Sequence, residues 1–407
     1  MHDFEDGIGD LQDALSHHVE TKNRTRILDL VQRLFDRSGV PLRLKRSDWD
    51  LLLTTLRELE ESAQNGALGA IGKKIDRFER VIHAFERPDG SAIWSDPNEP
   101  DARRSKRRAK RATGSEPRID GEVLALREST ITDAAPLAVF HSESDQAWLA
   151  IDDRNPVDSF QVEFGLKRNV FLGPSGRDNT VNDVDLNIRT LVPTIRLVRG
   201  TNAHAFEWSW RSKGRIVTRT AALLGDEGVA ILAEEVDDQG EGAVMRVEIP
   251  EGIVASPIPE SSSIRLSARR GASVVVVPLA LSPFPGASDQ GSLRVEECNG
   301  KRYLVLTQSS VPGANRLWLP LATVWRRLPS RTTLRRKKLT VSEKSTVCPP
   351  GVAFAARLPW DVGDSLLVYR SLAKKALRAV LGHYVKSSFL IAKFNADGDL
   401  APIIDID

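Results

Sequence analysis

The spacing of apolar residues changes about a quarter of the way along the chain. Up to about Arg87, apolar residues recur every three or four positions, which is the period of an amphipathic helix. From about Gly121 onward they form short alternating or continuous runs bounded by Gly, Pro, Asn and Asp, which is typical of strands. The pattern predicts an α+β protein with a small N-terminal helical bundle and a large antiparallel β-sandwich.

Residues 1–90 are predicted to form the bundle, with about three or four helices. Each helix is indicated by an apolar stripe that ends at Gly or Pro residues. The stripes consist of Ile27, Leu28, Val31, Leu34 and Phe35; of Trp49, Leu52, Leu53, Leu56 and Leu59; and of Ile71, Ile75, Phe78, Ile82 and Phe85. Residues 91–120 follow as a basic, Pro-containing linker, in which seven of the nine residues from Arg103 to Arg111 are Arg or Lys.

Residues 121–407 are predicted to form the sandwich. Two hairpins are indicated, at the turn Gly225–Gly228 and at Asn299-Gly300. The clearest alternation is His204–Trp210, which places Phe206, Trp208 and Trp210 on one face of a strand. We interpret that face as the core of a sheet, and a sugar-stacking platform is the alternative.

Composition adds few constraints. The net charge of +2 over 407 residues gives no overall field for nucleic acid or membranes, so local clusters must carry any such claim. No apolar run is long enough to span a membrane, and the acidic start has no signal-peptide pattern, so we expect a soluble cytoplasmic protein. Cys298 and Cys348 are predicted to be buried thiols, and a bridge between them stays open.

Motifs that would assign a reaction are absent from the sequence. There is no P-loop, no G-x-S-x-G and no dinucleotide-binding glycine motif. His141, His204 and His383 are far apart and show no metal-ligand spacing. We therefore expect no cofactor and no metal, and the sequence leaves open whether the protein is an enzyme.

A cluster of tryptophans and arginines is the best candidate for ligand binding. Aromatic rings stack on sugars and arginines pair with anions, so this order suits an anionic polysaccharide. The predicted ligand-binding residues are Trp318, Trp325, Arg326, Arg327, Arg335 and Arg336. The alternative is a charged loop or edge strand, where such residues prevent aggregation.

Tyr369, His383 and Tyr384 are the candidate catalytic residues. Together with Arg370 and Arg378, such side chains can remove a proton beside a carboxylate and neutralise the charge that develops. The alternative is that these side chains serve packing and surface roles.

The stretch from about His204 to Asp407 resembles the C-terminal β-sandwich of the heparinase II/III-like polysaccharide lyases. The resemblance lies in Trp210-Arg211, in Gly214–Thr220 and in Ile231–Val236. It implies a sandwich fold and a connection with carbohydrate. It carries no catalytic residue over, because that family takes most of them from a helical toroid several times longer than the helical segment here.

Three functions follow as hypotheses. The first is binding or processing of an anionic polysaccharide. The second is a non-enzymatic scaffold that docks a protein partner through its helical unit, which an exposed stripe of Leu52, Leu56 and Leu59 would favour. The third is nucleic-acid binding through the basic clusters, although no aromatic residue for base stacking lies within Arg103–Arg111.

Overall fold

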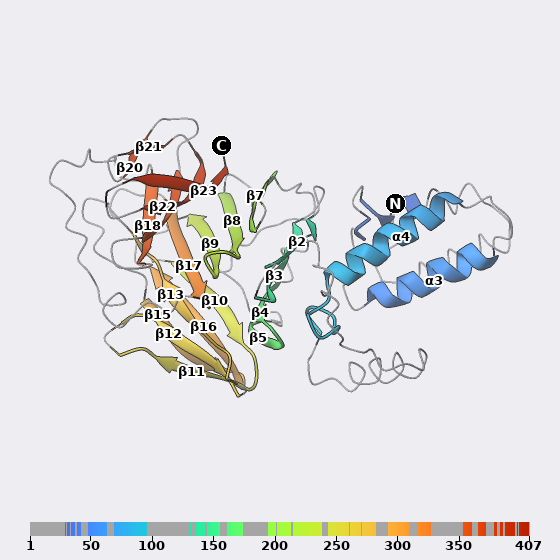
Figure 1. Ribbon diagram of the computed structural model, residues 1–407, viewed down its shortest axis with the longest axis horizontal. Helices are drawn as coiled ribbons and strands as arrows, with labels where there is room; N and C mark the ends of the chain where they lie inside the picture. The colour runs from blue at the N-terminus through green and yellow to red at the C-terminus, as the bar shows by residue number, and fades with distance from the viewer. Residues whose placement is uncertain are drawn as a thin grey trace. The chain divides into compact units, whose positions relative to one another are not determined.

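The computed structural model divides into two compact units. The first comprises Met1–Phe140 with Ala150–Arg154, and the second comprises His141–Leu149 with Asn155–Asp407 (Figure 1). The structure describes the following residues: 29, 31–32, 34–36, 39–41, 48–62, 69–95, 130–131, 136–142, 145–154, 161–173, 194–200, 202–212, 215–237, 243–259, 261–269, 271–281, 292–308, 316–326, 353–359, 365–371, 378–380, 383–385, 387–394, 397 and 399–406.

Two helices are described in the first unit, α3 (Trp49–Ser62) and α4 (Gly69–Ala84). Their apolar stripes face each other: the Trp49 ring lies 5.8 Å from Phe78 and 5.3 Å from Phe85, between ring centroids. Of the three stripes predicted from the sequence, those on α3 and α4 are therefore packed faces. Besides a few helical residues around Val31, the described residues of this unit contain no further helix, so the predicted bundle is not shown.

The strands along the first part of the β-rich region are short. β1 pairs antiparallel with β2, and β4 pairs antiparallel with β5. These strands are β1 (Thr130–Ile131), β2 (Leu137–His141), β3 (Ala147–Asp152), β4 (Gln161–Leu166) and β5 (Asn169–Leu172).

An antiparallel sheet of eight strands forms the centre of the second unit. In spatial order its strands are β11 (Ile253–Pro257), β12 (Ile264–Ala268), β13 (Ser273–Pro278), β17 (Arg316–Val324), β9 (Val229–Asp237), β8 (Arg215–Leu224), β7 (Ala203–Ser212) and β6 (Thr194–Arg199). Every residue of 217–224 and of 229–235 is buried, so other layers cover both faces of β8 and β9.

Three smaller sheets of this unit follow, and all their pairings are antiparallel. The five-stranded sheet contains β14 (Ala280–Leu281), β18 (Ala353–Pro359), β19 (Ser365–Ser371), β22 (Phe389–Phe394) and β23 (Leu400–Ile406). The three-stranded sheet contains β10 (Ala243–Ile249), β16 (Lys301–Gln308) and β15 (Ser292–Cys298), and the last pair is β20 (Arg378–Val380) with β21 (His383–Val385).

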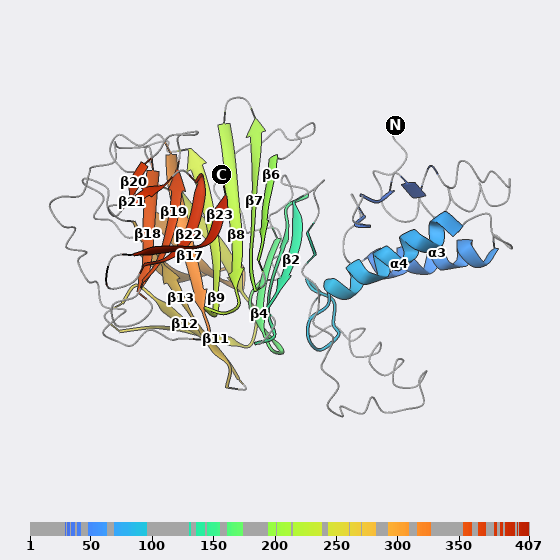
Figure 2. The same ribbon diagram turned by 45° about the horizontal axis from the view of Figure 1, so that its top comes forward.

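The five-stranded sheet packs against one face of the eight-stranded sheet. β23 contacts β6 and β7, and β17 contacts β18. Figure 2 shows β18, β19 and β22 running alongside β17, β9 and β8 in this arrangement. The predicted antiparallel β-sandwich is therefore confirmed.

Both predicted hairpins are also confirmed. The turn Gly225–Gly228 joins β8 to β9, and Asn299-Gly300 joins β15 to β16. Asn299 and Gly300 have φ angles of 51° and 74°, as a two-residue turn between twisted strands requires. Cys298 beside this turn is a free, exposed thiol, so the prediction that it is buried was wrong. Cys298 is exposed because it ends β15, the solvent-facing edge strand of its sheet. Cys348 lies outside the described residues.

Candidate functional site

The structure brings two predicted ligand-binding residues, Trp325 and Arg326, together directly after β17. The single carboxylate oxygen Oδ2 of Asp145 accepts a hydrogen bond from Trp325 Nε1 at 2.9 Å and lies 2.9 Å from Arg326 Nε. The Trp325 ring also packs against Phe164, with 5.6 Å between the ring centroids. We call the set Asp145, Phe164, Trp325 and Arg326 the Trp325 corner.

The β8–β9 turn fixes this corner from the other side. The backbone N–H of Trp325 donates to the carbonyl of Gly228 at 2.9 Å, and Arg326 Nη1 donates to the carbonyl of Asp226 at 2.8 Å. Gly228 has a φ of 68°, and a Cβ there would lie 2.1 Å from Cβ of Arg326. Glycine is thus required at this position, for its conformation and for its size.

The Trp325 corner exposes the charged Arg326 side chain to solvent more than it exposes the Trp325 ring. Trp325 is 9% exposed, so its ring is largely covered, whereas the Arg326 side chain is 33% exposed. A guanidinium held by fixed partners presents its donors in a set direction, which suits recognition of a carboxylate or a sulfate. Such a corner can orient an anionic ligand.

The other predicted ligand-binding residues lie elsewhere. Trp318 is 1% exposed in β17, where it pairs with Glu235 of β9. Arg327, Arg335 and Arg336 lie outside the described residues.

The predicted catalytic residues come from two sheets. Tyr369 of β19 is completely buried in a cluster with Leu367, Leu390 and Ala392, on the opposite side of the strand from Arg370. His383 and Tyr384 are consecutive residues of β21, paired with Val380 and Ala379. The structure describes the backbone of these two residues, and their shared role with Tyr369 stays a prediction.

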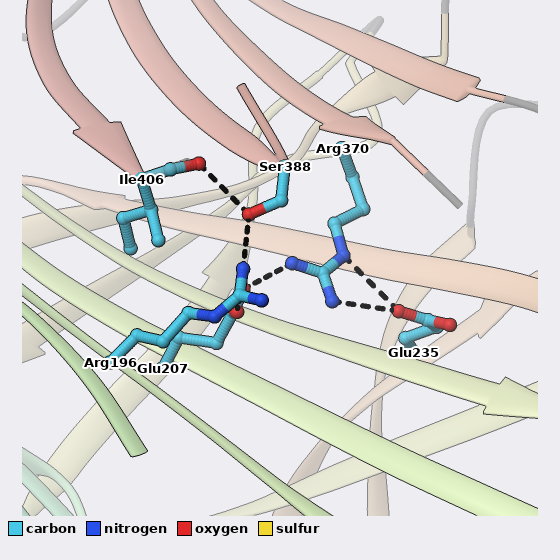
Figure 3. A network of polar contacts seen from close by, with 6 residues as sticks. All are labelled: Arg196, Glu207, Glu235, Arg370, Ser388 and Ile406. Atoms are coloured by element: carbon cyan, nitrogen blue, oxygen red, sulfur yellow. Dashed lines mark hydrogen bonds and ion pairs between the residues drawn. The ribbon is translucent and has the colours of Figure 1, made fainter. Parts of the chain in front are cut away.

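A buried ionic network lies between the two sheets of the sandwich, and we did not predict it (Figure 3). Arg370 of β19 donates from Nε and Nη2 to Glu235 Oε2 at 3.1 and 3.0 Å, and from Nη1 to Glu207 Oε2. Arg196 Nη1, from β6, lies 3.7 Å from Glu207 Oε1 and donates a hydrogen bond to Ser388 Oγ at 2.7 Å. The network therefore links β19 of one sheet with β6, β7 and β9 of the other.

The charged side chains of this network stabilise one another in their charged forms. Burial lowers the pKa of Arg370, but the attraction of Glu207 and Glu235 and their hydrogen bonds outweigh it, so the pKa is raised from its ordinary value. Arg370 therefore keeps its charge at all pH values at which proteins are handled. Because Arg370 is buried between the carboxylates of Glu207 and Glu235, we interpret it as a clamp between the two sheets and not as a residue that contacts a ligand.

Metal ligands do not gather in the described residues, where no group of three or more His, Cys, Asp or Glu side chains lies close enough to hold an ion. Nor is any helix in that part of the chain long and apolar enough to cross a membrane.

Polysaccharide lyases that act on heparan sulfate share the fold described above. Solved structures with this fold match the chain across nearly its whole length, so the resemblance inferred from His204–Asp407 is confirmed and extends beyond that stretch. At identities this low, the likeness shows the fold alone.

Two of these structures illustrate the match. The heparan sulfate lyase HepC from Pedobacter heparinus has a TM-score of 0.57 and 10% identity, over 98% of this chain and 63% of that one. A heparinase III has a TM-score of 0.55 and 12% identity, over 95% of this chain and 60% of that one. The chain thus spans about three fifths of the length of these proteins. No family model matches its sequence, and no curated protein does.

Proposed function

We propose that this protein binds and processes an anionic polysaccharide, with Trp325 and Arg326 at the contact surface. The observation that carries the proposal is the likeness to heparan sulfate lyases over 98% of the chain at a TM-score of 0.57. The Trp325 corner supplies what such a ligand needs, a positioned guanidinium beside an indole N–H. Arg327, Arg335 and Arg336 follow closely in the sequence and would extend the positive charge along the polymer.

Processing is the finer part of the proposal. A lyase removes the proton beside a uronate carboxylate, and a histidine or tyrosine serves as the base. The electron pair of the broken C–H bond forms a C=C bond, and the glycosidic C–O bond breaks so that the oxygen leaves and takes up a proton. We assign the role of the base to one of the two consecutive residues His383 and Tyr384 of β21. Tyr369 belongs to the same predicted set, and because it is 0% exposed its hydroxyl would act only if the surrounding cluster opened.

The scaffold alternative gains no support from the helices. Leu52 and Leu56 are both 0% exposed, so the stripe that would have served for docking is covered where the structure describes it. The Leu59 side chain lies outside that description. Protein and nucleic-acid partners stay predictions from the sequence.

Retention on immobilised heparan sulfate tests the contact surface. We expect the wild-type protein to bind and Arg326→Gln to bind roughly 10- to 150-fold more weakly, because one charge-assisted contact is worth about 1.5–3 kcal/mol. The matched control is Arg294→Gln in β15, which removes an equally positive side chain that is 47% exposed and paired with Glu296. Equal affinities of the two variants would rule out a specific role for Arg326.

A further inference from the structure

We propose that Asp145 sets the specificity of the Trp325 corner by occupying the position that an acidic group of the ligand would take. The proposal rests on polysaccharide binding at Arg326. Asp145 Oδ2 lies 2.9 Å from Trp325 Nε1 and 2.9 Å from Arg326 Nε. An oxygen of a ligand carboxylate or sulfate would contact the same two donors. The corner thus carries its own anion.

The Asp145 carboxylate can move away from Trp325 and Arg326 while these two side chains keep their positions. It lies in the turn between β2 and β3, and its side chain is 25% exposed. Arg326 is held independently of Asp145, by its hydrogen bond to the Asp226 carbonyl and by packing on Gly228. Phe164 likewise holds the Trp325 ring in place. A ligand anion can therefore replace the carboxylate while both donors keep their positions.

This exchange selects ligands by charge. A neutral sugar hydroxyl is a weaker acceptor than the carboxylate that it would have to displace, so neutral polymers are excluded. A sulfate or uronate group matches the charge of Asp145, and a polymer that carries many such groups adds attraction from neighbouring positive side chains. Asp145 would accordingly make the corner specific for densely charged polysaccharides.

Asp145→Asn tests the proposal, because it keeps the shape and one acceptor oxygen but removes the charge. We expect it to bind heparan sulfate about fivefold more tightly than wild type, the upper end for an exposed ion pair. We also expect tighter binding of a polymer with sparse carboxylates, such as hyaluronan. The matched control is Glu251→Gln, which removes one carboxylate charge from an exposed position in the turn between β10 and β11. This control should change the affinity less than twofold.

The outcomes separate this inference from the proposed function. The inference is supported if Asp145→Asn binds heparan sulfate more tightly than wild type and the control variant does not. It is also supported if Asp145→Asn binds heparan sulfate and wild type does not. Equal affinities of wild type and Asp145→Asn, equal gains in both variants, or weaker binding by Asp145→Asn would overturn the inference and leave polysaccharide binding intact. If neither wild type nor either variant binds heparan sulfate, both proposals fail. Thermal unfolding of each variant verifies that it is folded.

Discussion

Replacing Arg370 with methionine is expected to lower the free energy of unfolding by about 3–5 kcal/mol, because it leaves buried carboxylates without their cation. Glu207 and Glu235 are 5% and 3% exposed, so water cannot take the place of the guanidinium. Arg196, 3.7 Å from Glu207, compensates for one of the two at most. Urea unfolding followed by tryptophan fluorescence measures the loss.

Two controls decide whether the lost stability comes from the unpaired charges. The triple variant Arg370→Met, Glu207→Gln, Glu235→Gln removes the cation together with both carboxylates, and should recover much of the loss. Arg294→Met removes a cation from β15 that is 47% exposed and whose partner Glu296 is itself 35% exposed, and should cost less than about 0.5 kcal/mol. A loss below about 1 kcal/mol for Arg370→Met would contradict the account of a clamp between sheets.

The contribution of Arg370 should not vary with pH in the usual range. The folded-state pKa is raised above its ordinary value, so the stabilisation is fully present below the unfolded-state pKa and is lost only as the pH rises through the folded-state value. Both lie in strongly alkaline solution. The difference in unfolding free energy between wild type and the triple variant, which has no titratable side chain at positions 207, 235 and 370, should therefore be the same at pH 7 and pH 9.

The second large effect is expected at Trp318, where alanine should cost about 3–5 kcal/mol of stability. The side chain is 1% exposed in β17, so its removal leaves a large cavity in the sandwich. Trp318→Phe refills much of that cavity and should cost less. We expect Trp318→Phe to retain heparan sulfate as wild type does, in contrast with Arg326→Gln. Normal stability together with lost binding would instead make Trp318 a contact residue.

The sequence predicted those parts of the fold that depend on local chemistry. Asn299-Gly300 specifies a tight turn because both residues accept positive φ, and the stripes around Leu52 and Phe78 specify helices because their spacing leaves one apolar face. The hairpin at Gly225–Gly228 follows from the same turn chemistry. In each case neighbours in the chain are also neighbours in space.

The candidate site depended on contacts that local patterns do not contain. Trp318 and Trp325 look alike in the sequence, yet one is covered by the sandwich and the other sits beside Asp145, which lies 180 residues away. Glu207 alternates with Trp208 as a solvent-facing residue would, but a second sheet covers its face and supplies Arg370. Only the pairing of distant strands decides which polar residue is inside.

The most direct test of polysaccharide binding is the salt-dependent retention of the wild-type protein on heparan sulfate, compared with a neutral glucan. Absorbance of unsaturated sugar ends is followed in the same incubation. We predict retention on heparan sulfate that weakens with salt, no retention on the glucan, and growth of the absorbance that His383→Gln or Tyr384→Phe reduces. Absence of retention and absorbance with every anionic polysaccharide tried would contradict it.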